Sequence, residues 1–180
     1  RGLKPLADAA HARGMKFVLW LLPVSVSPGT KWATEHADAL YPHPEDQPGL
    51  WRIGDPDYRE WLTDWLVGTL DEYEVDIYRE DGSGMPPEEG PDDRIGIAQM
   101  KHVEGLYQYW HDAVVKSHAQ LMDNCCGGGN RIDIETSKIG FYLWRSDFND
   151  IGEGLKGPAH WPLMARADQV MAGGLALYMP

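Results

Sequence analysis

Two short segments of the chain each end in an aspartate, and the placement of the two aspartates suits a catalytic pair. Asp81 ends the segment 75–81, and Asp147 ends the segment 141–147. If both segments are strands of one parallel sheet, their carboxyl ends lie on the same edge, so Asp81 and Asp147 face each other across it. Glycoside hydrolysis needs two such carboxyl groups, because one attacks the anomeric carbon while the other protonates the leaving oxygen.

A structural role also fits these two residues. Asp is a favoured N-cap residue, so each Asp could cap the helix that follows its strand. Spacing alone leaves both interpretations open. Asp76 is a weaker candidate for chemistry, because it lies inside the predicted strand and is placed to orient a neighbour.

A glycine-rich run at 125–130 follows a third apolar segment. Glycine has no Cβ, so the backbone there can approach a bound ligand closely. The run also fits a tight turn between a strand and a helix, and the two interpretations do not exclude each other. It is not a phosphate-binding loop, because no Gly-Lys-Ser/Thr sequence follows it.

The elements that position these residues alternate along the chain. Stretches with apolar residues at helical spacing are separated by short apolar runs that are typical of buried strands. We expect helices at 3–10, 58–73, 103–114, 132–138 and 158–172, and strands at 16–22, 75–79, 120–124, 141–145 and 175–179. This alternation predicts one domain of parallel α/β structure. No Gly-x-Gly-x-x-Gly follows the first strand, so a dinucleotide-binding sheet is not favoured.

Two connections, 23–54 and 82–100, are too long to be plain turns. Both follow the carboxyl ends of predicted strands, where barrel enzymes build their active sites. Each of these two connections is therefore expected to be either a functional loop or a flexible surface insertion. We interpret most of the eight tryptophans as core residues rather than as platforms for sugar rings.

Composition excludes several classes of partner. The net charge of −12 disfavours nucleic acid, whose phosphates need Lys and Arg for neutralisation. The longest apolar run, 17–23, is too short for a membrane span, and no basic stretch precedes an apolar one, so we expect a soluble chain without a signal peptide. The sequence leaves the compartment open. The histidines lack metal-ligand spacing, and Cys125-Cys126 lacks a second Cys pair, so no metal or other cofactor is expected.

Four segments resemble glycoside hydrolase family 36, the α-galactosidases or melibiases. The segment 75–81, Val-Asp-Ile-Tyr-Arg-Glu-Asp, resembles the nucleophile strand, which implies that Asp81 is the nucleophile and that Arg79 contacts a substrate hydroxyl. The segment 123–133 is similar to the family's Cys-x-x-Gly-Gly-x-Arg-x-Asp signature. That match implies that Cys125 and Gly128 line the sugar pocket.

The same signature implies that Arg131 and Asp133 hold the loop. The segment 144–147 resembles the acid/base strand, which makes Asp147 the general acid/base and Trp144 and Arg145 substrate contacts. The segments 2–6 and 14–20 resemble the second helix and the third strand, with Trp20 at a position that lines the pocket.

The resemblance implies a (β/α)8 TIM barrel, incomplete here and covering about strands 3 to 7. Residues 1–180 would then be part of a single catalytic domain, with the first and last barrel units missing from this sequence. The implied activity is retaining hydrolysis of terminal α-galactosides through a covalent glycosyl-Asp intermediate, on an oligosaccharide or glycoside substrate. The implied partners include neither nucleic acid nor membrane, and the oligomeric state of the full-length protein stays open. Such a piece alone should be inactive and poorly stable, because it exposes edge strands and apolar faces.

Two alternatives remain. The family usually carries Glu-Pro-Glu after the third strand, whereas residues 21–25 read Leu-Leu-Pro-Val-Ser. That difference is compatible with a sugar-binding remnant without turnover. A transglycosylase that uses the same two Asp residues is the other alternative.

Overall fold

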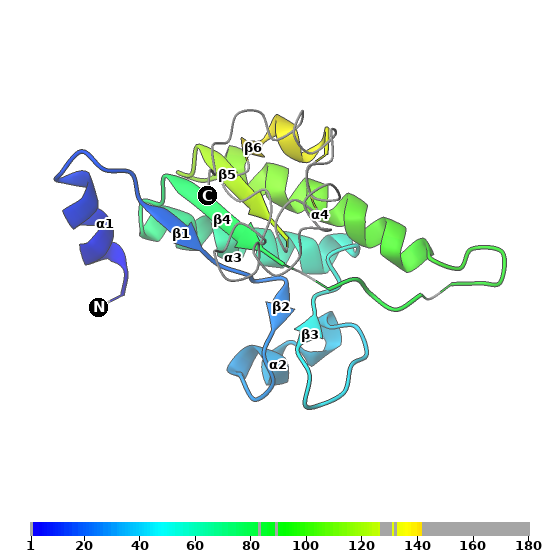
Figure 1. Ribbon diagram of the computed structural model, residues 1–180. Coiled ribbons are helices and arrows are strands. Elements are labelled where there is room, and N and C mark those ends of the chain that lie inside the picture. The colour runs from blue at the N-terminus through cyan, green and yellow to red at the C-terminus, as the bar shows by residue number, and fades with distance from the viewer. Residues whose placement is uncertain (1, 83, 89, 127–130, 132, 142–180) are drawn as a thin grey trace, which may run out of the picture.

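Helices and strands alternate in the computed structural model, which describes residues 2–82, 84–88, 90–126, 131 and 133–141 (Figure 1). The helices are α1 (Lys4–His11), α2 (Lys31–Glu35), α3 (Pro56–Glu72) and α4 (Ile97–Lys116), with short 3-10 helices at Ala37–Ala39 and Thr136–Lys138. The strands are β1 (Val18–Trp20), β2 (Ser25–Val26), β3 (Gly49–Leu50), β4 (Ile77–Asp81), β5 (Leu121–Cys125) and β6 (Gly140–Phe141). None of the helices in these ranges is both long and apolar enough to cross a lipid bilayer.

Four strands form one parallel sheet in the order β1-β4-β5-β6. The four strands therefore lie side by side in the sheet in the same order in which they occur along the chain. Helices α3 and α4 lie side by side along one face of the sheet (Figure 1). The predicted parallel α/β class is therefore confirmed for the part of the chain that the structure describes.

The limits of the strands differ from the predicted ones. β4 begins two residues later than the predicted 75–79 and continues to Asp81, because its hydrogen-bonded ladder with β5 runs from Ile77 to Asp81. Asp81 is thus the last residue of a strand. The helix that follows begins only at Ile97 and has Gly96 at its N-cap. The interpretation of Asp81 as a helix N-cap is therefore wrong.

Other predicted elements are shorter than expected or lie elsewhere. The strand predicted at 16–22 narrows to β1, and the helix predicted at 132–138 is a single 3-10 turn, Thr136–Lys138. Only the start of the strand predicted at 141–145 is described, as β6. The helix at 158–172 and the strand at 175–179 lie outside the described residues.

Helix α3 begins at Pro56, two residues before the predicted range 58–73. The Asp55 carboxylate accepts a hydrogen bond from the Asp57 amide over 3.0 Å, and Pro56 occupies the first turn, where its missing N–H is not needed. Its buried residues include Leu62, Leu66 and Leu70, which recur every four residues and form one stripe. This stripe belongs to a core shared with α4 and the sheet.

The connection 23–54 is a packed subdomain rather than a flexible insertion. β2 and β3 pair antiparallel, and Val24, Leu40 and Ile53 are buried. The Trp51 ring stacks on Trp61 of α3, with 5.2 Å between ring centroids and an interplanar angle of 18°. The prediction that most tryptophans are core residues holds for Trp51 and for Trp110 of α4, which are each 1% exposed, but not for Trp20 and Trp61, which are 60% and 39% exposed. Aromatic packing therefore ties this connection to α3.

A glycine lets α4 approach the start of α3 closely. A Cβ placed on Gly105 would clash with the carbonyl oxygen of Ile53, and one placed on Gly54 would lie 2.9 Å from the Lys101 carbonyl carbon. Real Cβ atoms do not reach such distances. The two backbones therefore touch at a point that only glycine permits.

We expect Gly105→Ala to lower the free energy of unfolding of the full-length protein by about 1–3 kcal/mol, because the added methyl group overpacks this contact. Gly68→Ala in α3 is the matched control, since a Cβ there meets nothing within 4 Å. It should raise the same free energy by about 0.5–1 kcal/mol, as Ala is the better helix former. Urea unfolding measures both, and equal effects would contradict the close contact.

Candidate active site

The carboxyl ends of β4 and β5 place an arginine between two carboxylates. Alternate residues of a strand share a face, and the register sets Asp123 opposite Arg79 and Cys125 opposite Asp81. Arg79 Nη1 donates to Asp123 Oδ2, and Arg79 Nη2 donates to Asp81 Oδ2 over 3.2 Å. The Asp123 side chain is fully buried, whereas that of Asp81 is 21% exposed. Asp81 is therefore the carboxylate that a ligand can reach.

Arg79 remains a cation in this setting. Burial lowers its pKa, but the hydrogen bond from Arg79 to Asp123 and the charge of that carboxylate raise it more, so the pKa lies above its ordinary value. A guanidinium has five N–H donors in a planar fork. Arg79 can consequently hold Asp81 and Asp123 and still offer an N–H to the hydroxyl of a ligand.

Trp20 and Cys125 complete the cluster. Trp20 lies opposite Arg79 in the register of β1 and β4, and the centre of its ring is 5.3 Å from the Arg79 guanidinium carbon. Trp20 is 60% exposed, so much of its surface remains accessible. Cys125 is buried beside Asp81.

The structure thus brings together four of the eight residues predicted for the site, namely Trp20, Arg79, Asp81 and Cys125. The other four, Gly128, Trp144, Arg145 and Asp147, lie outside the described residues. Their roles, and those of the first four, stay predictions. Within the described ranges, no group of three His, Cys, Asp or Glu side chains is placed to hold a metal ion.

Asp76 belongs to the opposite end of the sheet. It precedes β4 and accepts hydrogen bonds from Lys16 Nζ over 2.6 Å and from the Phe17 amide over 2.8 Å, and it contacts His11 Nε2 at 2.7 Å. Burial alone would raise the pKa of Asp76, but these partners outweigh burial and hold the pKa well below its ordinary value. Asp76 thus fastens α1 and β1 to β4, away from the candidate site.

Sequence reasoning missed two acidic residues near the site. Asp123 begins the segment 123–133 that is similar to the family signature, but its pairing with Arg79 depends on the register of β4 and β5. Glu80 lies between the two predicted site residues of β4 and points to the other face, where Tyr78 Oη donates to its Oε2. The period-two alternation of a strand was the signal that could have separated Glu80 from Arg79 and Asp81.

Glu80 is a fully buried carboxyl group. Its Oε1 lies 3.7 Å from Arg131 Nη1, so Arg131 is its nearest charged partner among the ion pairs of the described chain. Burial raises the pKa of Glu80 to about 7, against the opposing charge of Arg131 and the hydrogen bond from Tyr78. The carboxyl group therefore changes its charge near neutral pH.

This raised pKa gives a pH-dependent stability with a defined sign. In the unfolded chain Glu80 loses its proton near pH 4.5, whereas in the folded protein it keeps the proton up to about pH 7. Protonated Glu80 therefore contributes up to about 3 kcal/mol to the free energy of unfolding. This contribution is present in full below pH 4.5 and is lost as the pH rises through about 7. Glu80→Gln cannot titrate, so urea unfolding at pH 5 and at pH 7.5 should show a smaller loss of stability for this variant than for the wild type. Equal losses in the two proteins would contradict this assignment.

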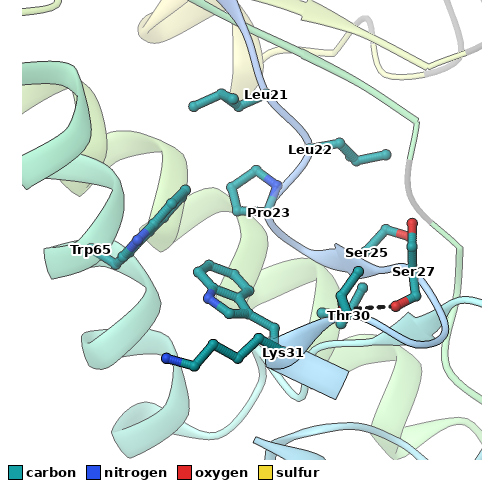
Figure 2. Close-up of a pocket in the computed structure, with 10 residues that line it drawn as sticks. Leu21, Leu22, Pro23, Ser25, Ser27, Thr30, Lys31 and Trp65 are labelled. Carbon is teal, nitrogen blue, oxygen red and sulfur yellow. Dashed lines mark hydrogen bonds between the residues drawn. The ribbon is translucent and has the colours of Figure 1, made fainter. Parts of the chain in front are cut away.

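An apolar pocket of about 410 Å³ lies beyond the end of β1 (Figure 2). Leu21, Leu22 and Pro23 form one side, and Trp32 and Trp65 contribute aromatic rings. The stretch 21–25, Leu-Leu-Pro-Val-Ser, directly follows β1 and stands where the family pattern has Glu-Pro-Glu, so apolar residues line this pocket at the end of β1.

Comparisons of sequence agree with the motifs. No protein-family model matches the chain. It is 29% identical to α-galactosidase Mel36A of Lactobacillus acidophilus over 165 residues, which are 86% of this chain and 22% of that protein. It is 25% identical to an α-galactosidase of Escherichia coli over 156 residues, 83% of this chain and 22% of that protein. The chain thus spans about a fifth of the length of the curated relatives it matches.

Comparisons of structure agree as well. The family 36 α-galactosidase AgaA of Geobacillus stearothermophilus superposes with a TM-score of 0.74 at 20% identity, over 94% of this chain and 24% of that one. An α-galactosidase of Lactobacillus brevis gives 0.72 at 20% identity, over 96% and 23%. The fold of this chain therefore matches part of the fold of these α-galactosidases. The predicted resemblance to glycoside hydrolase family 36, over part of the family's chain, is confirmed.

Proposed function

We propose that this chain is part of a retaining α-galactosidase in which Asp81 is the nucleophile and Asp147 is the general acid/base. The observation that carries the proposal is the position of Asp81, at the end of β4, exposed to a ligand and held by Arg79. Curated relatives named α-galactosidases support the substrate class. Structures of AgaA in complex with stachyose and with raffinose support an oligosaccharide as substrate.

The proposed reaction has two displacements. The Asp81 carboxylate attacks the anomeric carbon while the bond from that carbon to the leaving oxygen breaks, and the Asp147 carboxylic acid gives its proton to the leaving oxygen. The Asp147 carboxylate then takes a proton from water, whose oxygen attacks the anomeric carbon and releases Asp81. Retention of configuration follows from the two inversions.

Arg79 prepares the first displacement. Its hydrogen bond fixes one Asp81 oxygen, so the carboxylate is oriented before the substrate arrives, and its remaining N–H groups suit a sugar hydroxyl. Cys125, Gly128 and Trp20 are proposed to line the sugar pocket, and Trp144 and Arg145 to contact the substrate. In the complete (β/α)8 barrel that we propose, β1, β4, β5 and β6 are strands 3 to 6, and strand 7 corresponds to the predicted strand 175–179, which lies outside the described residues.

Sugar binding without turnover is a second candidate, which one observation favours. Residues 21–25 read Leu-Leu-Pro-Val-Ser where the family pattern has Glu-Pro-Glu, and Leu21, Leu22 and Pro23 of this stretch line an apolar pocket, so the acidic side chains of that pattern are absent there. Binding of a galactoside by the full-length protein without hydrolysis would select this candidate.

The nucleophile assignment gives the first test of activity. Full-length protein should hydrolyse an aryl α-galactoside, and Asp81→Asn should lower kcat by about a thousandfold or more, because no carboxylate remains to attack the anomeric carbon. Asp46→Asn makes the same chemical change at an exposed position and should leave kcat near the wild-type value. Activity of Asp81→Asn close to that of the control would contradict the assignment.

Azide separates the two carboxyl roles. With an activated aryl α-galactoside, Asp147→Gly should give α-galactosyl azide, because azide replaces water after the covalent intermediate has formed. Asp81→Gly should give the β-azide by a single inversion. A crystal structure of the full-length protein should place the two carboxyl groups about 5–5.5 Å apart. The same azide anomer from both variants, or a separation of about 6.5–9.5 Å, would argue against retention.

A further inference from the structure

Asp123 is a buried acidic residue in the middle of β5, and the proposed reaction gives it no role. Its side chain is fully buried, and Arg79 Nη1 donates a hydrogen bond to its Oδ2. Taking two charges out of water largely offsets the attraction between them, so a buried ion pair is a poor source of stability. This pair is therefore better explained by the orientation that it imposes on the groups it joins.

The position of the pair is set by a row of side chains that crosses three neighbouring strands. Trp20 of β1, Arg79 of β4 and Asp123 of β5 are direct neighbours in the two ladders. The Trp20 ring lies on one side of the Arg79 guanidinium, with 5.3 Å between the guanidinium carbon and the ring centre. The Asp123 carboxylate accepts its hydrogen bond from the side of β5. The guanidinium is therefore held from both of the strands that flank β4.

Asp81 lies outside this row, two residues further along β4, where the strand ends. It is the last residue of β4, and Gly82 follows it with a φ of 75°, in the left-handed region. Asp123, by contrast, has strand residues on both sides, because β5 extends from Leu121 to Cys125. The buried carboxylate thus belongs to the centre of a strand, and the accessible carboxylate belongs to a strand end.

A guanidinium can transmit orientation from one carboxylate to the other, because it is planar and rigid. Arg79 Nη1 is bound to Asp123, so the direction of Nη2 is defined, and Nη2 donates to Asp81 Oδ2 over 3.2 Å. A lysine ammonium has one nitrogen on a flexible stem and would not define such a direction. Both carboxylates have further interactions as well, and these add to the link through Arg79 rather than replace it.

We propose that Asp123 is a positioning residue for the nucleophile: it fixes the Arg79 guanidinium, which in turn holds the Asp81 carboxylate in the orientation for attack. The inference rests on the proposed function and deepens it, because it assigns a role to a fully buried residue behind the site. Without the charge of Asp123, Arg79 keeps Asp81 as a counter-charge and turns toward it. Both Nη groups then bind the Asp81 oxygens, so this carboxylate loses its orientation for attack.

A double-mutant cycle on the full-length protein tests the link through Arg79. Asp123→Asn keeps the shape of the side chain and removes its charge. It should lower kcat for an aryl α-galactoside about thirtyfold, because a misplaced nucleophile attacks slowly. In an Arg79→Gln background the same change should lower kcat less than about threefold, since the link is already broken. A merely structural role of Asp123 would give the same factor in both backgrounds.

Asp76→Asn is the matched control for this cycle. Asp76 is also a buried aspartate with a cationic partner, Lys16, but it lies at the opposite end of the sheet. Asp76→Asn should lower the stability of the protein and still leave kcat of the folded protein within about twofold of its value in either background, because the two sites are far apart.

Labelling with phenylglyoxal follows Arg79 without any need for activity, because the reagent attacks an accessible, unprotonated guanidine. Burial lowers the pKa of Arg79, but its hydrogen bond to Asp123 and the charge of that carboxylate raise it more. Labelling of the Arg79 peptide at pH 8 should therefore be about tenfold faster in Asp123→Asn than in the wild type or in Asp76→Asn. Arg94, whose side chain is 65% exposed, is the internal reference in each protein.

The outcomes separate the positioning role from the proposed function. If the wild type does not hydrolyse the galactoside while Arg79 is labelled faster in Asp123→Asn, the proposed function fails and the fixing of Arg79 by Asp123 stands. Labelling of Arg79 in Asp123→Asn at the wild-type rate overturns the positioning role. An equal loss of kcat on Asp123→Asn in the two backgrounds overturns it as well.

Discussion

The candidate site depends on the parallel pairing of β4 with β5. The ladder sets Arg79 opposite Asp123 and Asp81 opposite Cys125, so one hydrogen-bonding register decides which side chains meet at the sheet edge. A shift of the β4 register by one residue would turn the Arg79 and Asp81 side chains to the other face of the sheet and bring Glu80 to their face. Helices α3 and α4 cover one face of the sheet, and the contact at Gly105 sets how closely α4 approaches α3.

The side chains on the two faces of β4 lie in different surroundings. On one face, Arg79 links a buried carboxylate to an accessible one, which leaves Asp81 oriented and open to a ligand. On the other face, Glu80 is fully buried, and this burial raises its pKa to about 7. Neighbouring residues of a single strand thus lie in very different surroundings, since Asp81 is partly exposed and Glu80 is fully buried.

Much of this arrangement could be predicted from the sequence, for identifiable reasons. Apolar periodicity predicted the order of the described helices and strands, because this signal is local. The resemblance of the segment 75–81 to the family's nucleophile strand correctly predicted that Arg79 and Asp81 lie on one strand, β4. The register of β4 against β5 could not be derived, since it is fixed by contacts between segments far apart in the chain. For this reason the Arg79–Asp123 pair and the buried position of Glu80 were missed. The packing of the connection 23–54 was missed likewise, because stacking of Trp51 on Trp61 is a tertiary contact.

The central claim is that Asp81 forms a covalent bond to the sugar, and trapping that bond tests it most directly. A 5-fluoro-α-galactosyl fluoride reacts rapidly through its good leaving group, while its ring fluorine slows release of the sugar by destabilising a cationic transition state. After reaction with the full-length protein and proteolysis, mass spectrometry should find the fluorosugar on the peptide that contains Asp81, attached to that side chain. Attachment to another residue, or hydrolysis of the reagent without any labelled peptide and with inverted configuration, would contradict the account.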